Sequence, residues 1–365
     1  MPTPKRVLST IAIIIALYLV NALMSKEGLF GFGLGDYPAD VLMTLTINVI
    51  LAVSLNLITG FTGQFSIGHA GFMAIGAYSS AYLVVYHAQF WERDLAGTVG
   101  FTVAHALIFV IAIAFGSLVA AFAGLLVGIP SLRLRGDYLA IVTLGFAEII
   151  RIVILNIDKV GGATCFSVPG YSNFIWVGGL AIISIVIVHN IVHSDIGRAL
   201  VSIREDELAA EAMGINTTRY KVLAFVISSA LAGLAGVLFG HYRSFLSTND
   251  FQFIRSFEII IMIVLGGMGS LTGAVLGAIV ITIMPELLRQ MPGDLSRYRL
   301  VVYSALLIVI ILTRPQGILG TREFSLSWLK RSRKQPEGAQ VVGGTGGVSI
   351  AEQEPSDSKK DRENR

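Results

Sequence analysis

Residues 41–91 read VLMTLTINVILAVSLNLITGFTGQFSIGHAGFMAIGAYSSAYLVVYHAQFW, and none of them is Asp, Glu, Lys or Arg. A second run, Phe101 to Leu132, also lacks these four residue types. Each run is longer than the ~20 residues that cross a bilayer as a helix, so we expect one span or more in each and two in the first. Both runs are apolar without alternation, which favours helices over a membrane barrel. The pattern predicts an all-α integral membrane protein.

The composition of the whole chain indicates the same class. Of its 365 residues 54% are hydrophobic and 14% are charged, and the mean hydropathy is +0.73. Soluble domains carry about 25% charged residues. The net charge of +3 is too small to indicate a nucleic-acid partner. A single cysteine, Cys165, excludes a disulfide framework within the chain.

The sequence contains no recognisable catalytic or metal-binding motif. It has no G-x-x-x-x-G-K-[ST] phosphate loop, no H-E-x-x-H, no Cys/His cluster and no G-x-S-x-G elbow. We therefore expect a protein that is not an enzyme, that holds no metal or cofactor, and that does not hydrolyse nucleotide through a phosphate loop of its own.

The hydropathy pattern predicts about ten transmembrane helices. They lie near residues 7–24, 40–58, 66–88, 101–128, 138–156, 174–193, 222–241, 256–268, 271–289 and 299–313. With ten spans, the basic residues Lys5, Arg6 and those of 330–334 fall on one side, which the positive-inside rule makes cytoplasmic. A count of nine is the alternative, with residues 256–289 as one broken helix.

The two ends of the chain are expected in the cytoplasm. Residues 7–24 are too long for a signal-peptide core, so we interpret them as an uncleaved first span. The transmembrane domain is predicted over residues 1–320. Residues 321–365 are predicted to form a largely disordered cytoplasmic tail, because the chain from Pro336 on has few large apolar residues.

A charged island, residues 194–221, interrupts the apolar chain with SDIGRALVSIREDELAAEAMGINTTRYK. Each charge would cost roughly 2.5–3.5 kcal/mol at mid-membrane, so the island is expected outside the hydrocarbon. The stretch after Ile203 predicts a small amphipathic helix that ends at Gly214 and presents a face to a soluble partner. The candidate contact residues are its charged members and its terminal glycine: Arg204, Glu205, Asp206, Glu207, Glu211 and Gly214.

Polar residues gather where the third span begins. Gln64, Ser66 and His69 lie at or near membrane depth, where an unpaired polar group costs several kcal/mol. Such groups either bond to a neighbouring helix or line a wet cavity. Taken together they indicate a wall of a translocation pathway.

The fifth span supplies three further pathway candidates, Thr143, Glu148 and Arg151. Glu148 and Arg151 are three residues apart, so they share a helix face and can neutralise each other. Ionisable residues within a membrane are functional candidates by default. A self-neutralising pair can equally be architectural, and both interpretations stay open.

Glycines interrupt the chain between the eighth and ninth spans. Gly266, Gly267, Gly269 and Gly273 supply a helix break and the start of a small-xxx-small stripe. A broken helix at membrane depth is tolerated only where it is buried or faces a cavity. Close helix packing is the leading interpretation of these glycines.

Five segments, in order along the chain, resemble the larger membrane permease subunit of branched-chain amino-acid ABC importers. They are TGQFSIGHAGFMAIGAY (62–78), SLRLRGDYLAIVTLGFAEIIR (131–151), REDELAAEAMGINTTRYKVLAFVISSALAGLAGVLFG (204–240), LGGMGSLTGAVLGAIVITIMPELLR (265–289) and RYRLVVYSALLIVIILTRPQGILG (297–320). The resemblance covers about residues 40–320. It implies an importer permease of the type II-like class in a bacterial inner membrane.

The resemblance also implies a set of partners. These are a second, related permease, two cytoplasmic ATP-binding cassette subunits that bind and hydrolyse the ATP, an extracytoplasmic solute-binding protein, and an amino-acid substrate. The helix of the island would then be the coupling helix that contacts an ATPase subunit. A departure from the family pattern follows the fifth span, where Gly161-Gly162 is followed by Ala163-Thr164-Cys165 in place of a small-polar, Gly-rich stretch.

Two other functions remain open at this point. Permeases for urea or short amides look similar, and their binding proteins would drive uptake of a different substrate. An ion-coupled secondary transporter would work alone, without ATP. A membrane scaffold without transport is a further, more distant alternative.

Overall fold

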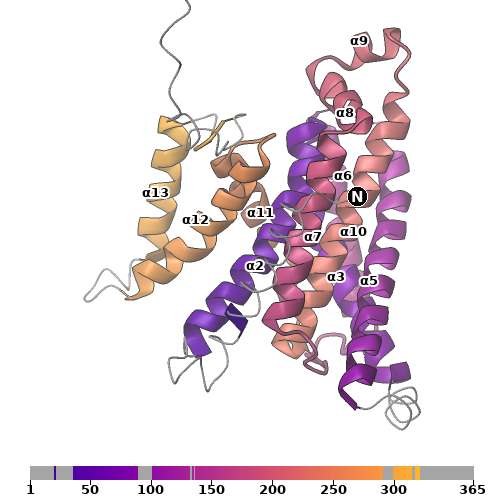
Figure 1. Ribbon diagram of the computed structural model, residues 1–365, viewed down its shortest axis with the longest axis vertical. Helices are drawn as coiled ribbons and strands as arrows, with labels where there is room; N and C mark the ends of the chain where they lie inside the picture. Colours follow the sequence, from indigo (N-terminus) through magenta and orange to yellow (C-terminus); the bar gives the residue numbers. More distant parts are fainter. Residues whose placement is uncertain are drawn as a thin grey trace, which may run out of the picture. The chain divides into compact units, whose positions relative to one another are not determined.

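The computed structural model describes residues 20–21, 36–88, 101–131, 134, 136–290, 299–314 and 317–320. The first predicted span, 7–24, lies outside the described residues except for 20–21, and so does the predicted tail from residue 321 on. The described chain is mainly helical (Figure 1).

Each of the other predicted spans corresponds to a helix. The long helices are α2 (Asp36–Asn56), α3 (His69–Leu83), α5 (Phe101–Ser131), α6 (Asp137–Leu155), α7 (Phe174–Val192), α10 (Thr217–Arg243), α11 (Phe253–Gly266), α12 (Leu271–Gln290) and α13 (Arg299–Thr313). Two π-helical turns, η1 (Leu57–Phe61) and η2 (Val84–Ala88), continue α2 and α3. The all-α membrane class is confirmed.

Six of the described helical segments are long and apolar enough to cross a membrane, judged by length and composition alone: 37–61, 103–131, 137–155, 174–192, 217–243 and 271–289. The helix α11, with 14 residues, extends about 21 Å, short of the ~30 Å hydrocarbon core. It is therefore a partial span.

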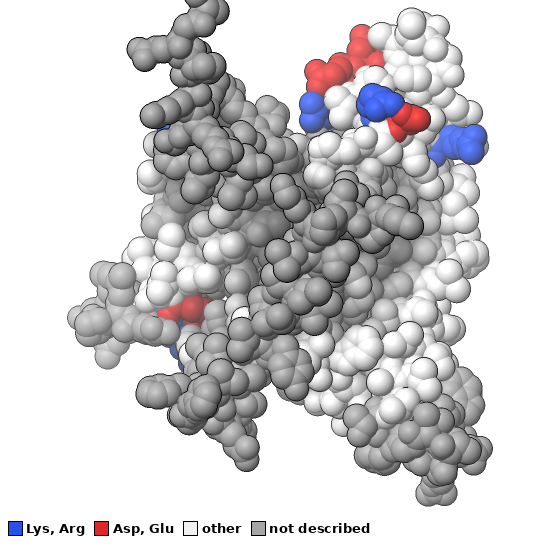
Figure 2. Space-filling model, viewed as in Figure 1, with Lys and Arg blue, Asp and Glu red and all other residues white. Residues whose placement is uncertain are grey.

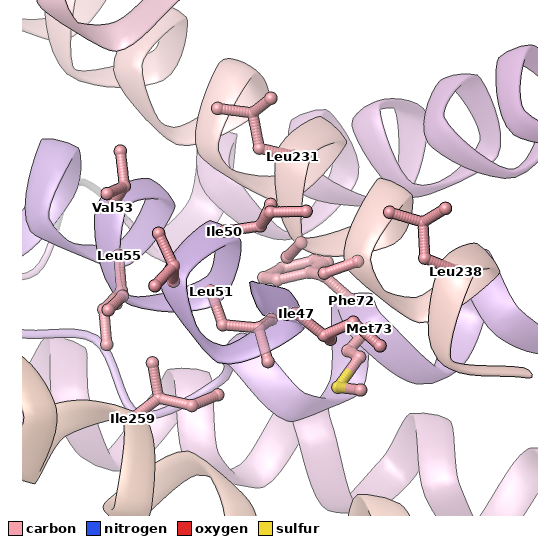
Figure 3. Close-up of a cluster of buried hydrophobic side chains, with 14 of the residues drawn as sticks. Ile47, Ile50, Leu51, Val53, Leu55, Phe72, Met73, Leu231, Leu238 and Ile259 are labelled. Atoms are coloured by element: carbon pink, nitrogen blue, oxygen red, sulfur yellow. The ribbon is translucent and has the colours of Figure 1, made fainter. Parts of the chain in front are cut away.

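The hydrophobic core lies where α2, α3, α10 and α11 meet (Figure 3). The side chains at its centre are almost completely buried: Ile47, Ile50 and Leu51 of α2, Phe72 and Met73 of α3, Leu238 of α10 and Ile259 of α11. Because lipid tails are as apolar as these side chains, close packing stabilises such a core more than removal from water does.

Small residues bring α3 and α10 into backbone contact. A Cβ atom on Gly76 would overlap the backbone of Gly233, and one on Gly236 would overlap the carbonyl oxygen of Met73. These approaches place the two helix axes closer than larger residues would permit. Helix α5 packs against the same pair.

The segment over 256–289 is a helical hairpin. The chain reverses at Gly267–Ser270, and α12 returns antiparallel along α11, since Gly266 contacts Gly273 while Gly277 contacts Met262. Residues 256–289 therefore do not form the one broken helix of the alternative, and the count of nine or ten spans stays a prediction. The hairpin is either two passes or a re-entrant pair.

Two short strands and two one-turn helices lie in the loop after α6 and in the loop before α11. Strand β1 (Phe166–Ser167) pairs antiparallel with β2 (Phe245–Leu246), which follows α10. The one-turn helices η3 (Asp158–Val160) and η4 (Thr248–Phe251) lie in the same loops. They hold the loop after α6 against the loop that leads into α11.

Candidate functional site

The charged island folds into two helices where the sequence predicted one. Helix α8 (Asp195–Glu205) precedes α9 (Glu207–Ala212), and the last residues of the island, from Thr217 on, already belong to α10. The helix α8 was missed, although its apolar residues Ile196, Leu200 and Ile203 recur at the spacing of one helix face. Figure 2 shows acidic and basic side chains close together over the end of the molecule that α8 and α9 form.

The two island helices differ in burial. Helix α8 packs against the membrane helices through one face, with Ala199, Leu200 and Ile203 buried. Helix α9 is more exposed: Leu208 and the residue after its end, Met213, are 64% and 83% exposed. The island therefore has an anchored part and a projecting part.

Local hydrogen bonds define both ends of α9. The Asp206 carboxylate accepts from the backbone N–H groups of Leu208 and Ala209, at 2.9 and 3.0 Å, which caps the helix start. At the other end Gly214 has a φ of 85°, and the N–H of Ile215 donates to the carbonyl of Ala210. This is a Schellman ending, which requires the left-handed conformation that glycine adopts at low cost.

The acidic residues of α9 bind to α10. The ammonium of Lys221 lies 2.6 Å from Glu207, and its side chain is only 6% exposed. The hydroxyl of Thr217 donates to Glu211 at 2.7 Å. Glu207 and Glu211 therefore fix α9 on α10, and Leu208 with Met213 forms the apolar part of the projecting surface.

Arg204 connects the island to two breaks in the membrane helices. Its guanidinium donates from Nη1 to the carbonyl oxygen of Gly60 at 2.9 Å and pairs with Glu205 at 2.7 Å. A Cβ atom on Gly269 would lie 2.8 Å from the same Nη1. The end of α8 thus contacts the π-helical turn after α2 and the reversal between α11 and α12.

Asn56 holds these two breaks together and is fully buried. Its Oδ1 accepts from the N–H of Gly269, and its Nδ2 donates to the carbonyl of Ser270, both at 3.0 Å. Sequence reasoning missed Asn56, because one amide within an apolar run carries no local signal. We name the group Arg204, Asn56, Gly60 and Gly269 the Arg204 junction.

The break glycines are packed against backbone. A Cβ atom on Gly266 would overlap the Gly273 carbonyl, and one on Gly273 would lie 2.7 Å from the Gly266 oxygen. Gly267 has a φ of 119° and Gly269 one of 83°, so both adopt backbone conformations that favour glycine.

The first three pathway candidates are buried and lie in one segment. Ser66 and His69 are each 1% exposed, and Gln64 is 6% exposed. The ring Nε2 of His69 is 2.7 Å from the hydroxyl of Ser54. The Oε1 of Gln64 is buried and has no partner among the described residues.

Thr143 joins this segment, whereas Glu148 and Arg151 do not. The Thr143 hydroxyl accepts from the N–H of Ile67 at 3.0 Å. Glu148 pairs with Arg151 at 2.8 Å and accepts from the N–H of Phe253 at 3.1 Å, at the first residue of α11. That carboxylate therefore lies at the N-terminus of α11, where it interacts favourably with the positive end of the helix dipole.

A polar cluster joins α2, α11 and α12. Arg255 pairs with Glu258 at 2.7 Å and donates to Asn48 at 2.6 Å, and Asn48 donates to Thr282 at 2.8 Å. Arg255 and Glu258 lie three residues apart on α11, but Asn48 is more than two hundred residues away from them, so no spacing pattern links the whole cluster.

A cavity of about 290 Å³ lies between the island and the membrane helices. Its walls come from residues 62–65, from residues 203–207, from Lys221, and from four residues before and within α6: Leu134, Gly136, Asp137 and Leu139. Its polar members include Gln64 and six charged residues, four acidic and two basic: Asp137, Glu205, Asp206, Glu207, Arg204 and Lys221. In the described part of the chain, no three His, Cys, Asp or Glu residues are placed to hold a metal ion.

Comparison with known proteins gives one consistent match. The family described as the permease component of the branched-chain amino acid transport system matches residues 37–311. The chain is 35% identical over 318 residues to the high-affinity branched-chain amino acid transport system permease protein LivM of Salmonella typhimurium, covering 77% of this chain and 69% of that protein.

Two further relatives come from Escherichia coli K12. The chain is 33% identical to its permease protein LivM over 341 residues, 83% of this chain and 74% of that protein. It is 37% identical to its permease protein LivH over 131 residues, 36% of this chain and 42% of that protein. No solved structure matches the chain significantly.

Proposed function

Because the chain belongs to the family of branched-chain amino acid transport permeases, we infer that it is a transmembrane permease subunit of an importer for branched-chain amino acids. Similarity to the LivM proteins covers most of the chain, and similarity to LivH covers about a third of it. The chain is thus the larger type of permease and works with a second, related one. The names of these relatives favour branched-chain amino acids over urea or short amides.

The importer is ATP-driven, with two ATPase subunits in the cytoplasm and a solute-binding protein on the other side. The ATPases hydrolyse the ATP, and this chain carries the substrate. The α8–α9 end faces the cytoplasm of a bacterial inner membrane. The positive-inside rule supports this orientation, because Arg198, Arg204, Arg219 and Lys221 gather at that end.

The observation that carries this proposal is the Arg204 junction. An ATPase subunit that contacts Leu208 and Met213 of α9 would move α9 and α8 together. Lys221 and Thr217 pass that displacement to α10. Arg204 passes it to the ends of α2 and α11, which Asn56 joins. The core helices α2, α10 and α11 are therefore all connected to the island helices α8 and α9.

The translocation pathway is proposed to open along the segment from Gln64 to His69 and its contact with Thr143 of α6. In the arrangement described, His69 bonds to Ser54 and Thr143 accepts from the N–H of Ile67, and these bonds close the route. Displacement of the α2 end by Arg204 would release this segment. Glu148 and Arg151 have a positioning role here, because they hold the start of α11.

A reconstituted complex tests this function. The chain is co-expressed with the partner permease and the ATPase subunits, placed in vesicles and supplied with the binding protein. We expect leucine uptake that requires ATP. Uptake driven by a proton or sodium gradient without ATP, or uptake of urea in place of leucine, would overturn the proposal.

Substitution of Arg204 tests the coupling route itself. Arg204→Met removes the hydrogen bond to Gly60 and the pair with Glu205. We expect leucine uptake per ATP hydrolysed to fall roughly tenfold, because the loss of a charged hydrogen bond changes an equilibrium by about 1.5–3 kcal/mol. Arg198→Met is the matched control, since Arg198 is 72% exposed and pairs only within α8 among the described residues. Equal ratios for the two variants would contradict the route.

A further inference from the structure

The cavity beside the island has the chemistry of a small ligand site. Its volume of about 290 Å³ is at the lower end for ligand pockets, which suits a molecule smaller than a drug. It touches three parts of the chain at once: the segment 62–65, the start of α6, and the junction between α8 and α9. A ligand there would bridge the island and the membrane helices.

Two groups of this cavity have unused capacity for a hydrogen-bond donor. Gln64 is 6% exposed, and its buried Oε1 has no partner among the described residues. Asp137 is an exposed residue in the first turn of α6 and has no ion-pair partner in the described chain. An acceptor amide and a free carboxylate on one cavity fit an ammonium group.

The cavity also offers a cation and an apolar wall. Lys221 carries three N–H donors, and Glu207 takes one of them at 2.6 Å, so donors remain for a carboxylate. The apolar side chains of the lining are Phe65, Leu134, Leu139 and Ile203. Ammonium, carboxylate and apolar partners together describe an apolar α-amino acid.

We propose that this cavity binds the imported amino acid from the cytoplasmic side and thereby slows import. This inference rests on the proposed function, which places the cavity in the cytoplasm and names the cargo. The ammonium of the amino acid bonds to Asp137 and Gln64, its carboxylate to Lys221, and its side chain contacts the apolar wall. Bound in this way it holds the α8–α9 junction on the segment 62–65, against the displacement that the ATPases drive.

Direct binding tests the site independently of transport. Radiolabelled leucine is added to the purified permease–ATPase complex in nanodiscs, without the binding protein. We expect saturable binding at millimolar leucine, competition by valine, and weak competition by 4-methylpentanoate, which lacks the ammonium. Absence of saturable binding, or equal competition by 4-methylpentanoate, would overturn the proposal.

Three variants locate the bound leucine. Asp137→Asn and Gln64→Leu should each weaken binding by roughly tenfold, because the first removes the negative charge opposite the ammonium and the second removes a hydrogen-bond acceptor. Asp195→Asn is the matched control: Asp195 is also an acid in the first helical turn, of α8, and does not line the cavity. An equal effect of Asp137→Asn and Asp195→Asn would exclude this site.

Transport measurements test the regulatory consequence. Vesicles are loaded with leucine or left empty, and the uptake ratio between the two is taken for each protein. We expect a low ratio for the natural protein and for Asp195→Asn, and a ratio near one for Asp137→Asn. Uptake into empty vesicles with no effect of internal leucine would refute the inhibitory role while leaving the proposed function intact. Absence of uptake into empty vesicles would refute the proposed function instead, and the binding experiment would still decide the site.

Discussion

Two interruptions of the helical chain, the island around α9 and the reversal at Gly267–Ser270, are held in place by different means. The island is held by charged side chains, with Lys221 on Glu207 and Arg204 on Glu205. The reversal is held by glycine backbone and by the neutral amide of Asn56. Much of the island is exposed, whereas Ser270 and Asn56 are fully buried.

The difference follows from the surroundings of each interruption. Water can satisfy the polar groups of a broken helix at the island, so its contacts can exchange partners when α9 moves. At the reversal, Asn56 and Ser270 are fully buried, so water cannot satisfy the polar groups beside them and these groups need fixed partners. The island is thus suited to receive a displacement, and the reversal is suited to transmit it without deforming.

The reversal should tolerate substitution least. Gly266→Leu places a side chain where even a Cβ atom would overlap the Gly273 carbonyl. We expect a loss of folded protein, because overpacking of this kind should cost about 3 kcal/mol. The monodisperse fraction in detergent measures this loss. Gly179→Leu in α7 is the control, since a Cβ atom on Gly179 meets no atom within 4 Å. Equal losses would show that the close backbone contact is unimportant.

Substituting one asparagine at each interruption allows their stabilities to be compared directly, because both side chains bind backbone groups. Asn56→Ala removes the partners of the Gly269 N–H and the Ser270 carbonyl in a buried place, which should cost about 2 kcal/mol or more, since each unsatisfied group costs about 1–3. Asn216→Ala removes one exposed cap at the start of α10, which should cost about 1 kcal/mol. Melting temperatures in detergent measure both changes. A larger decrease in melting temperature for Asn216→Ala than for Asn56→Ala would show that access of water does not explain the difference between the two interruptions.

The fold was largely predictable because the apolar runs set it. Residues 299–313 were predicted as a span, and α13 has the same bounds. Helix α10 begins at Thr217, earlier than the predicted 222, because Asn216 caps it within the charged island. Composition marks where a chain enters lipid, whereas a capping hydrogen bond marks where the helix begins.

The site was less predictable, because its contacts join residues that are distant in sequence. The candidates Arg204 and Gly269 were each visible as a charge or a glycine. Their meeting depends on Gly60 and Asn56, more than a hundred residues away along the chain. Glu207 and Glu211 looked like surface charges, yet both bind to α10. Their role as the contact surface for an ATPase stays a prediction.

Breaking the ion pair between Glu207 and Lys221 should destabilise the protein less than a substitution at the reversal and more than one at an exposed position of the island. Glu207→Gln leaves the ammonium of Lys221, with a 6% exposed side chain, without its charge partner. We expect a loss of about 1–3 kcal/mol, less than the 3–5 of a fully buried pair, because Glu207 is 25% exposed. Adding Lys221→Met should recover much of the melting temperature. A further decrease in the double variant would show that the pair is not the cause.

The exposed tip of α9 should show the smallest change in stability and still affect transport. Met213→Ser alters a side chain that is 83% exposed, so the free energy of unfolding should change by less than about 0.5 kcal/mol. The ATPase subunits should nevertheless co-purify less well, because an apolar contact at their interface is lost. The control is Phe245→Ser, a half-exposed apolar residue in the strand that follows the other end of α10. If both variants retain the ATPases equally, the tip of α9 is not the docking surface, and the island would have to receive its displacement through α8.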